Sequence, residues 1–249
     1  MKKLITYIIC FVAFINIHAQ DNRFENGNTF FSEEKYEEAI EAYSEILDSG
    51  VESTEVYFNL GNAYYKTGKL PEAILSYERA LLLSPNDKDV KYNLEMANMQ
   101  VTDKLETVGE FILISWFEDF KNTNKSDSWA IISIIAFVLA ALMIGFFFLS
   151  RSRAIKQFSF GMSILLVIVS VAAFNFAGAQ KDRLTNRNTA IIFEPSVSIK
   201  SSPSAGGTDL FILHEGTKVE ILEEVQGWNR IEISDGNDGW LPSSTIETI

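Results

Sequence analysis

The stretch NLGNAYYKTGKLPEAILSYERALLLSPN, Asn59 to Asn86, has the pattern of two helices joined by a short turn. Pro85 cannot continue a helix, so it marks the end of the second one. A fixed period in a sequence indicates an array of repeated units. Shifting this sequence by 34 residues aligns similar pairs, namely Gly27 with Gly61, Phe30 with Tyr64, Ala39 with Ala73 and Tyr43 with Tyr77. The sequence therefore predicts repeated helical hairpins.

Residues 54–87 resemble the tetratricopeptide repeat, in which small residues lie where two helices cross and aromatic residues fill the space beside them. The matching residues are Tyr57, Leu60, Gly61, Tyr64, Ala73, Tyr77, Ala80 and Pro85. Residues 20–53 form a weaker first copy, because Arg23 and Asn26 replace two of the apolar residues. One further helix, over roughly 88–102, begins a third copy. The resemblance predicts an all-α repeat domain over residues 20–103.

The resemblance also implies a groove, because one face of each first helix in such arrays lines a concave surface that holds a peptide or a partner helix. Residues spaced i, i+4 and i+7 share a helix face. The groove candidates are therefore Phe24, Asn28, Phe31, Phe58, Asn62, Tyr65, Tyr92 and Met96. For each aromatic residue, packing between repeats is the alternative role. The lysines with which chaperone-binding members hold a terminal carboxylate are missing, since Phe24 stands in the matching position.

The array is short, because two and a half repeats fall below the three that usually bury a continuous core. We therefore expect another helical-repeat protein, or a second copy of this chain, to stack on the last helix between Tyr92 and Val101. The first copy also contains a run of acidic residues, Glu33, Glu34, Glu37, Glu38, Glu41 and Glu45. It is either a solvated helix face or a surface for a basic partner.

Two apolar runs follow the repeats, Trp129–Leu149 and Phe158–Ala179, and each is long enough to span a hydrocarbon core. Neither run contains Asp, Glu, Lys, Arg or His, which argues against an ion pathway. The turn between them carries Arg151, Arg153 and Lys156. Positive charge in a short loop marks the cytoplasmic side, so the runs predict a transmembrane hairpin with a cytoplasmic turn.

The first nineteen residues have a basic start, an apolar run and a small residue at Ala19, which is the plan of a secretory signal peptide. Cys10, the only cysteine, lies inside this run, so its removal leaves no thiol for disulfides or thiolate catalysis. A cleaved signal peptide delivers the following chain to the extracytoplasmic side, in agreement with the basic turn. The opposing charges are Lys181, Arg183 and Arg187, directly after the second run. We expect both soluble parts in the periplasm, next to a bacterial inner membrane.

From about residue 190 the chain changes to short alternating runs separated by turn residues, which predicts a small β barrel. The series LFILHEGTKVEIL and GWNRIEISDGNDGWLP resembles a bacterial SH3-like domain. In related domains, aromatic residues on one side bind peptides or cell-wall fragments. The candidates for this surface are His214, Trp228 and Trp240, with packing in or beside the barrel as the alternative for each tryptophan. A lone histidine cannot make a metal site, and neither a metal nor a cofactor is predicted.

These features predict a multidomain membrane protein with an all-α repeat array, a two-helix transmembrane hairpin and an all-β SH3-like barrel. The predicted order is a signal peptide over 1–19, the repeat domain over 20–103, an amphipathic connector over 104–127, a transmembrane helix over 128–150, a cytoplasmic turn over 151–157, a second transmembrane helix over 158–179, a linker over 180–189 and the SH3-like domain over 190–249. The connector either lies along the membrane surface or extends the array.

The net charge of −12 is unevenly spread, since residues 21–100 carry 16 acidic against 7 basic residues and residues 188–249 carry 10 against 3. Acidic soluble parts repel phosphate backbones, so nucleic acid is not an expected partner. An enzyme is not expected either, because no acid, base, nucleophile or metal-ligand set converges in the sequence.

The order of segments resembles the Bacteroides aerotolerance protein E (BatE) family, whose members are found beside von Willebrand A-domain membrane proteins. This resemblance implies a non-enzymatic scaffold of an inner-membrane complex linked to aerotolerance or envelope stress. The alternative is a cell-wall sensor, in which the SH3-like domain binds peptidoglycan and the repeats recruit an effector.

Overall fold

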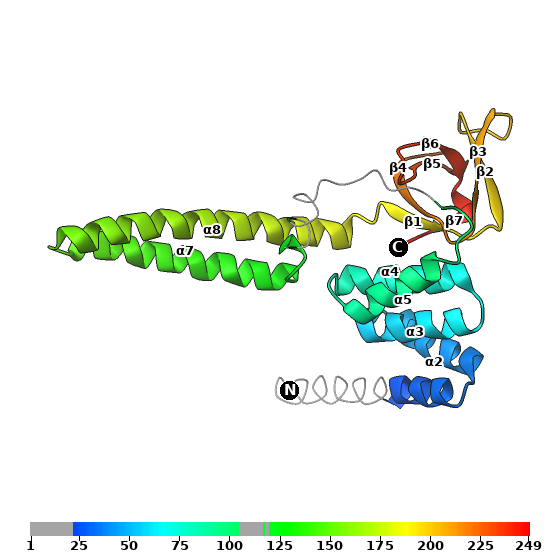
Figure 1. Cartoon of the computed structure of the whole chain (residues 1–249), viewed down its shortest axis with the longest axis horizontal. Coiled ribbons are helices and arrows are strands. Elements are labelled where there is room, and N and C mark those ends of the chain that lie inside the picture. The colour runs from blue at the N-terminus through cyan, green and yellow to red at the C-terminus, as the bar shows by residue number, and fades with distance from the viewer. Residues whose placement is uncertain (1–21, 105–116, 118–119) are drawn as a thin grey trace, which may run out of the picture. The chain divides into compact units, whose positions relative to one another are not determined.

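The computed structural model describes residues 22–104, 117 and 120–249 of the chain. These residues form two compact units, of which one combines residues 22–104 with residues 188–249 and the other holds the described residues between 117 and 187 (Figure 1). The first unit contains both the helical repeats and the β domain. The predicted signal peptide, with Cys10, and most of the predicted connector lie outside the described residues.

The repeats are built as the sequence predicts, from antiparallel helix pairs. The first repeat consists of a helix over residues 22–32 and α2 (Tyr36–Asp48), the second of α3 (Thr54–Lys66) and α4 (Leu70–Leu83), and the third of α5 (Lys88–Asn98) alone among the described residues. Side chains start two of these helices. Ser53 accepts a hydrogen bond from the Val56 N–H, and Asp87 accepts two from the first turn of α5.

Two glycines allow the helices of each complete repeat to touch. A Cβ atom at Gly61 would lie 2.6 Å from Cε1 of Tyr77, and one at Gly27 would lie 2.5 Å from Cε1 of Tyr43. Both tyrosine rings are buried, at 1% exposure. The role of the small residues in the repeat pattern is thereby confirmed, because each glycine gives room for the ring of the following helix.

The C-terminal domain is a seven-stranded antiparallel sheet in the order β3-β2-β6-β5-β4-β1-β7. Its strands are β1 (Thr189–Ile192), β2 (Ser196–Lys200), β3 (Asp209–His214), β4 (Lys218–Val225), β5 (Trp228–Glu232), β6 (Asp238–Pro242) and β7 (Ile246–Thr248). Alternate side chains point inward and form a core that includes Ile192, Ile199, Leu213, Ile231 and Leu241. The prediction of an all-β C-terminal domain is confirmed, and neighbouring strands of its sheet are antiparallel.

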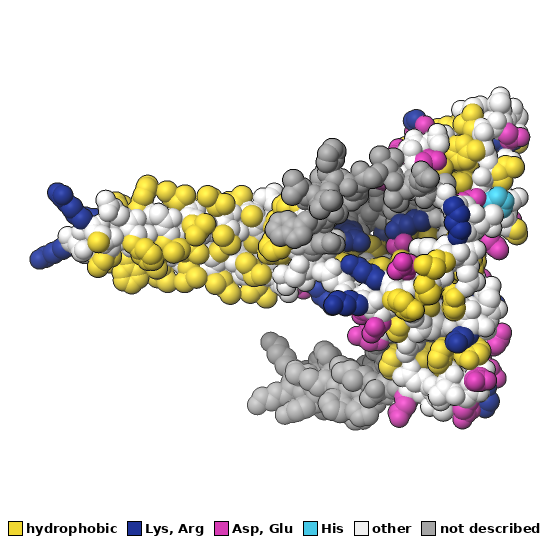
Figure 2. Space-filling view, in the orientation of Figure 1, with side chains coloured by type: hydrophobic (Ala, Val, Ile, Leu, Met, Phe, Trp, Pro, Cys, Tyr) yellow, Lys and Arg dark blue, Asp and Glu magenta, His cyan; other side chains and the backbone are white. Residues whose placement is uncertain are grey.

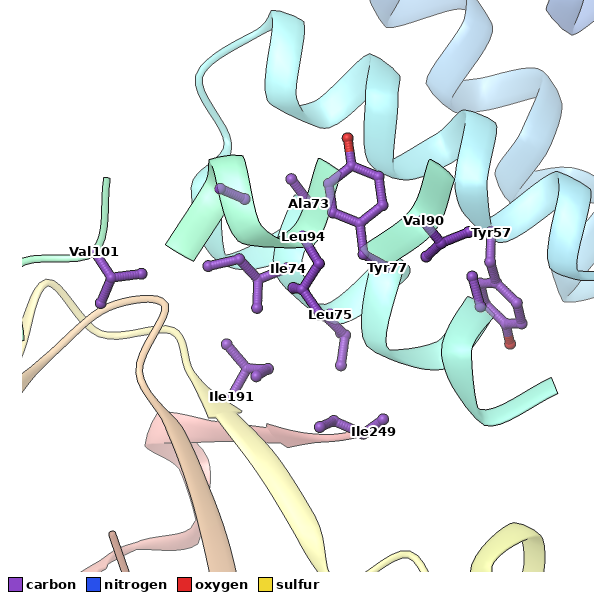
Figure 3. Packing of buried hydrophobic residues seen from close by; sticks show 12 residues of the cluster. Tyr57, Ala73, Ile74, Leu75, Tyr77, Val90, Leu94, Val101, Ile191 and Ile249 are labelled. Atoms are coloured by element: carbon purple, nitrogen blue, oxygen red, sulfur yellow. The ribbon is translucent and has the colours of Figure 1, made fainter. Parts of the chain in front are cut away.

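The repeats and the SH3-like domain share a second core (Figure 3). Ile191 of β1 and Ile249 at the chain end pack into the same cluster as Ile74 and Leu75 of α4, and Val101 lies beside them. All five side chains are less than 10% exposed.

The tight turn before β4 adds to this contact. Gly216 has a φ of +83°, and a Cβ atom there would lie 3.1 Å from both Ile74 Cδ1 and Val101 Cγ2. The SH3-like domain thus covers part of the surface that a second helix of the third repeat would cover.

The second unit is a hairpin of α7 (Ser126–Leu149) and α8 (Arg153–Thr185). Both helices are long and apolar enough to cross a membrane. Hydrophobic side chains cover much of the hairpin surface and basic side chains gather at its tip (Figure 2). Small residues face the partner helix instead, including Ala136 and Ala140 on α7 and Ala173 and Ala177 on α8.

A reciprocal pair of hydrogen bonds holds the middle of the hairpin. Ser133 Oγ donates to the Ser170 carbonyl at 2.9 Å, and Ser170 Oγ donates to the Ser133 carbonyl at the same distance. The last turns of α8 continue beyond the predicted span, through Lys181 and Arg183 to Thr185. These residues lie in the predicted linker, so the first part of that linker is helical.

Gly61→Ala tests the helix crossing. Alanine favours an isolated helix by about 1 kcal/mol, but its Cβ overlaps the buried Tyr77 ring, so we expect a net destabilisation of about 1–3 kcal/mol. Far-UV circular dichroism of full-length protein in detergent, followed through a urea titration, measures it. Gly145→Ala in α7 is the matched control, because no neighbouring atom lies within 4 Å of its Cβ position. A Gly61→Ala protein as stable as the wild type would contradict the crossing.

Candidate partner-binding surfaces

The first helices of the three repeats place apolar residues at equivalent positions, one from each repeat. Tyr92 of α5 and Met99, the residue directly after α5, are the most exposed, at 61% and 59%. The candidates in the earlier repeats are only partly exposed, because Phe24 packs on Tyr43 at 6.1 Å between ring centroids and Phe58 packs on Tyr77 at 6.2 Å. For these phenylalanines, packing against a tyrosine of the same repeat buries part of the side chain.

The other candidates on this surface also have neighbours. Phe31 meets Tyr36 edge to face at 5.3 Å, and the Tyr65 hydroxyl accepts a hydrogen bond from Gln100 Nε2. Met96 is partly buried. The open part of the surface is therefore concentrated on α5.

Asn28 and Asn62 act mainly inside the array. Asn28 Oδ1 accepts hydrogen bonds from the Tyr43 hydroxyl at 2.7 Å and from Asn59 Nδ2 at 2.9 Å. The next repeat copies this arrangement, with Asn62 Oδ1 accepting from the Tyr77 hydroxyl at 2.8 Å and from Asn93 Nδ2 at 2.7 Å. Each asparagine thus joins the second helix of its own repeat to the first helix of the next.

Sequence reasoning missed Asn59 and Asn93, although their 34-residue spacing was visible. Burial raises the pKa of Tyr43 to about 12 and raises the pKa of Tyr77 as well. Both hydroxyl groups therefore stay protonated at neutral pH and can donate these hydrogen bonds.

Asp103 is the main polar contact between the repeats and the SH3-like domain. Its carboxylate accepts hydrogen bonds from the His214 backbone N–H at 2.7 Å and from the Thr217 hydroxyl at 2.7 Å, and it lies 2.8 Å from His214 Nδ1. Partial burial alone would raise the pKa of Asp103, but the hydrogen bonds from His214 and Thr217 outweigh it and lower this pKa. Lys218 adds an ion pair with Glu78 at 2.7 Å.

Arg79 makes a further contact across the same junction. Its NH2 group donates to Glu247 Oε1 at 3.0 Å and to the Thr248 carbonyl at 2.7 Å. Of the three SH3-like surface candidates, His214 therefore lies at the junction with the repeats, and its side chain is 35% exposed.

The two tryptophans lie on a different face of the SH3-like domain. In the sheet register, Trp228 pairs with Pro242, and Trp240 pairs with both Arg230 and Lys200. Their neighbours along each strand, such as Asn229 and Leu241, are buried, so the tryptophans point outward. Both are partly exposed. Trp228, Trp240 and Arg230, which lies opposite Trp240 and two residues after Trp228, form the aromatic face of this domain.

The basic residues of the predicted turn lie at the tip of the hairpin. α7 ends at Leu149 and α8 begins at Arg153, which leaves Arg151 in the connection and Lys156 in the first turn of α8. Lys156 Nζ lies 5.7 Å from the centroid of the Phe147 ring. Across the described part of the chain, no group of three or more His, Cys, Asp or Glu side chains is arranged to hold a metal ion.

Comparison with known families places two modules in the chain. Residues 54–87 match the family described as tetratricopeptide repeat, residues 27–68 match TPR repeat, and residues 195–247 match bacterial SH3 domain. Modules of both kinds typically bind other molecules and do not catalyse reactions. No curated protein matches the chain.

Solved structures with similarity include the Sgt2 TPR domain from Aspergillus fumigatus, at 12% identity and a TM-score of 0.32, covering 68% of this chain and 82% of that one. A second is the first TPR of Spaghetti (RPAP3) bound to an HSP90 peptide, at 24% identity and a TM-score of 0.20, covering 32% and 90%. A third is the C-terminal SH3 domain of myosin IB from Entamoeba histolytica, at 27% identity and a TM-score of 0.16, covering 22% and 93%.

Asp103→Asn tests the polar junction. A lowered pKa in the folded protein means that Asp103 stabilises the fold above its ordinary pKa of 3.8 and that this contribution disappears as the pH falls below it. We expect the variant to lose about 1.5–3 kcal/mol of unfolding free energy at pH 7. Urea unfolding of the full-length protein between pH 7 and pH 3 measures the loss.

The difference from wild type should shrink toward the acid end of this range. Asp209→Asn is the control, because the Asp209 side chain is 61% exposed in its ion pair with Lys200. Equal stability of Asp103→Asn and wild type at pH 7 would contradict the assigned role.

Proposed function

We propose that this protein is a non-enzymatic scaffold of a bacterial inner membrane and that it binds partner proteins through the groove of its repeats. The observation that carries the proposal is the exposure of Tyr92 on the last repeat helix and of Met99 directly after it. Large apolar side chains on a repeat surface are typical of sites that bind a helix or an extended peptide.

The 34-residue period places apolar residues at equivalent positions along this surface. Tyr92 occupies the position of Phe24 and Phe58 in the earlier repeats, and Met99 occupies the position of Phe31 and Tyr65. A bound segment that crosses the three first helices would meet an apolar residue at the same place in each repeat. The expected partner segment therefore carries apolar residues along one side.

The shared core supports the proposed location. Because the repeats and the SH3-like domain pack together, both must lie on the same side of a membrane. The chain between them would then cross an even number of times, and α7 and α8 are long and apolar enough to make two crossings. The basic tip of the hairpin favours the cytoplasm, so both soluble parts would be periplasmic.

The more specific part of the proposal rests on the order of segments. That order resembles the BatE family, and it points to a complex with von Willebrand A-domain membrane proteins that serves aerotolerance or the response to envelope stress. A second repeat protein remains a candidate partner at the exposed side of α5.

A cell-wall sensor is the second candidate function, and the aromatic face of the SH3-like domain favours it. Trp228 and Trp240 are partly exposed on neighbouring strands, with Arg230 between them. Aromatic rings beside a charged group suit a sugar–peptide polymer such as peptidoglycan. In this function the repeats would recruit an effector after the wall is bound.

The joint variant Tyr92→Ala/Met99→Ala tests the groove. Both side chains are mostly exposed, so we expect folding to be kept and partner recovery to fall at least fivefold in crosslinking and affinity purification from native membranes. Leu222→Ala is the matched control, because Leu222 is an exposed apolar residue of β4. Unchanged protein recovery would contradict the groove, and recovery of wall fragments alone would favour the sensor.

Thiol labelling tests the topology. Replacing Cys10 by Ser removes the only cysteine, and single cysteines are then placed at the exposed positions Glu37, Ser152 and Ser204. In intact spheroplasts, a membrane-impermeant maleimide should label Glu37→Cys and Ser204→Cys. It should label Ser152→Cys, in the hairpin turn, only after permeabilisation. Labelling of Ser152→Cys in intact spheroplasts would contradict the proposed orientation.

A further inference from the structure

A cleft of about 780 Å³ lies where the repeats meet the SH3-like domain. Asn98, Val101 and Lys104 line it from the repeat side, and Glu220, Glu232 and Ser234 line it from the sheet. Its size is within the range of sites that hold small molecules or a few residues of a peptide. Exposed Tyr92 of α5 and Met99, directly after α5, are not among the residues that line it.

The sheet wall of this cleft has an unfavourable arrangement of charge. Glu220 of β4 and Glu232 of β5 lie directly opposite each other in the register. Glu232 also lies directly opposite Asp238 of β6 on its other side. Like charges at directly opposed positions destabilise a sheet. Three carboxylates thus form a row across three neighbouring strands.

The basic side chains around this row have other partners. Arg230 pairs with Asp238 at 2.7 Å, and Lys218 pairs with Glu78 at 2.7 Å. Lys104, on the opposite wall, donates to the Met99 carbonyl at 2.8 Å.

The two glutamates of the cleft are therefore left without a cation. Glu220 accepts a hydrogen bond from the neutral amide of Asn188 at 2.8 Å. Within the described residues, neither Glu220 nor Glu232 forms an ion pair with a lysine or arginine. Among the described residues, the wall consequently keeps two carboxylates without an ion-pair partner, and Lys104 of the opposite wall bonds to a carbonyl oxygen and not to either of them.

We propose that this cleft binds a basic side chain, arginine or lysine, from a segment of a partner protein. A guanidinium group placed between the carboxylates of Glu220 and Glu232 pairs with both and removes their mutual repulsion. Binding of a cation therefore gains from a repulsion that the free protein carries. The site is independent of the repeat groove, so either site can fail in an experiment while the other holds.

The test uses the full-length protein in lipid nanodiscs and two short probes, an acetylated and amidated Gly/Arg peptide and the same peptide with citrulline in place of arginine. Citrulline keeps the shape of the side chain but lacks its charge. In fluorescence anisotropy, the arginine peptide should bind the wild type more tightly than the citrulline peptide. The joint variant Glu220→Gln/Glu232→Gln should weaken arginine-peptide binding about fivefold or more and raise the midpoint of thermal unfolding.

Glu223→Gln is the matched control. Glu223 is on the same strand but lies opposite Arg230, so its neutralisation removes an attraction instead of a repulsion. It should leave peptide binding unchanged and should not raise the unfolding midpoint.

Two results would overturn the site. The first is equal binding of the arginine and citrulline peptides by wild type. The second is unchanged arginine-peptide binding by the joint glutamine variant, whatever its stability. Tyr92→Ala/Met99→Ala should keep the arginine-peptide affinity, and a loss there would move the basic contact to the repeat groove and contradict the cleft.

Discussion

The contact that the rest of the structure depends on is the apolar packing of Ile191 and Ile249 against α4 and Val101. Units of a repeat array contact only their neighbours, so the last unit exposes a face that must be covered. Here the chain covers it with its own C-terminal domain. Each fully buried isoleucine contributes roughly 1.5–3 kcal/mol relative to an exposed one. The SH3-like domain therefore acts as the end cap of the array.

The polar groups at this junction set its geometry. Apolar contacts tolerate sliding, whereas the Asp103 carboxylate needs the His214 N–H and the Thr217 hydroxyl at fixed places. An unpartnered carboxylate there would be costly, because its side chain is only 12% exposed. The two domains therefore form one body although the hairpin separates them in the sequence. The exposed residues of the last repeat and the two tryptophans of the SH3-like domain are thereby held in a fixed relation.

The sequence predicts well those features that depend on local spacing. The close approach of two helices at Gly61 follows from the repeat pattern, and the strands of the SH3-like domain follow from alternation and turn residues. It could not predict contacts between residues far apart, such as Asp103 and His214, which are 111 positions apart. No local pattern reports such a pair, since its formation depends on how two finished domains meet.

The same limit affects the candidate binding residues. Asn28 and Asn62 share a helix face with the groove aromatics, yet their side-chain oxygens are occupied by tyrosine and asparagine donors of the array. Helical periodicity identifies a face but not which of its side chains already have partners. The end of α8 differs from the predicted span for a related reason. Hydropathy shows that the apolar run ends at residue 179, but it does not show that the helix continues to Thr185.

The most direct test of the end-cap account is hydrogen–deuterium exchange of the full-length protein with Ile249 changed to Glu. Ile249 is the last residue of the chain and is 1% exposed, so the change places a charge in the shared core without altering any repeat residue. The account predicts that amides of α4 and α5 lose protection together with those of β7. Faster exchange confined to β7, with α4 and α5 unchanged, would contradict it.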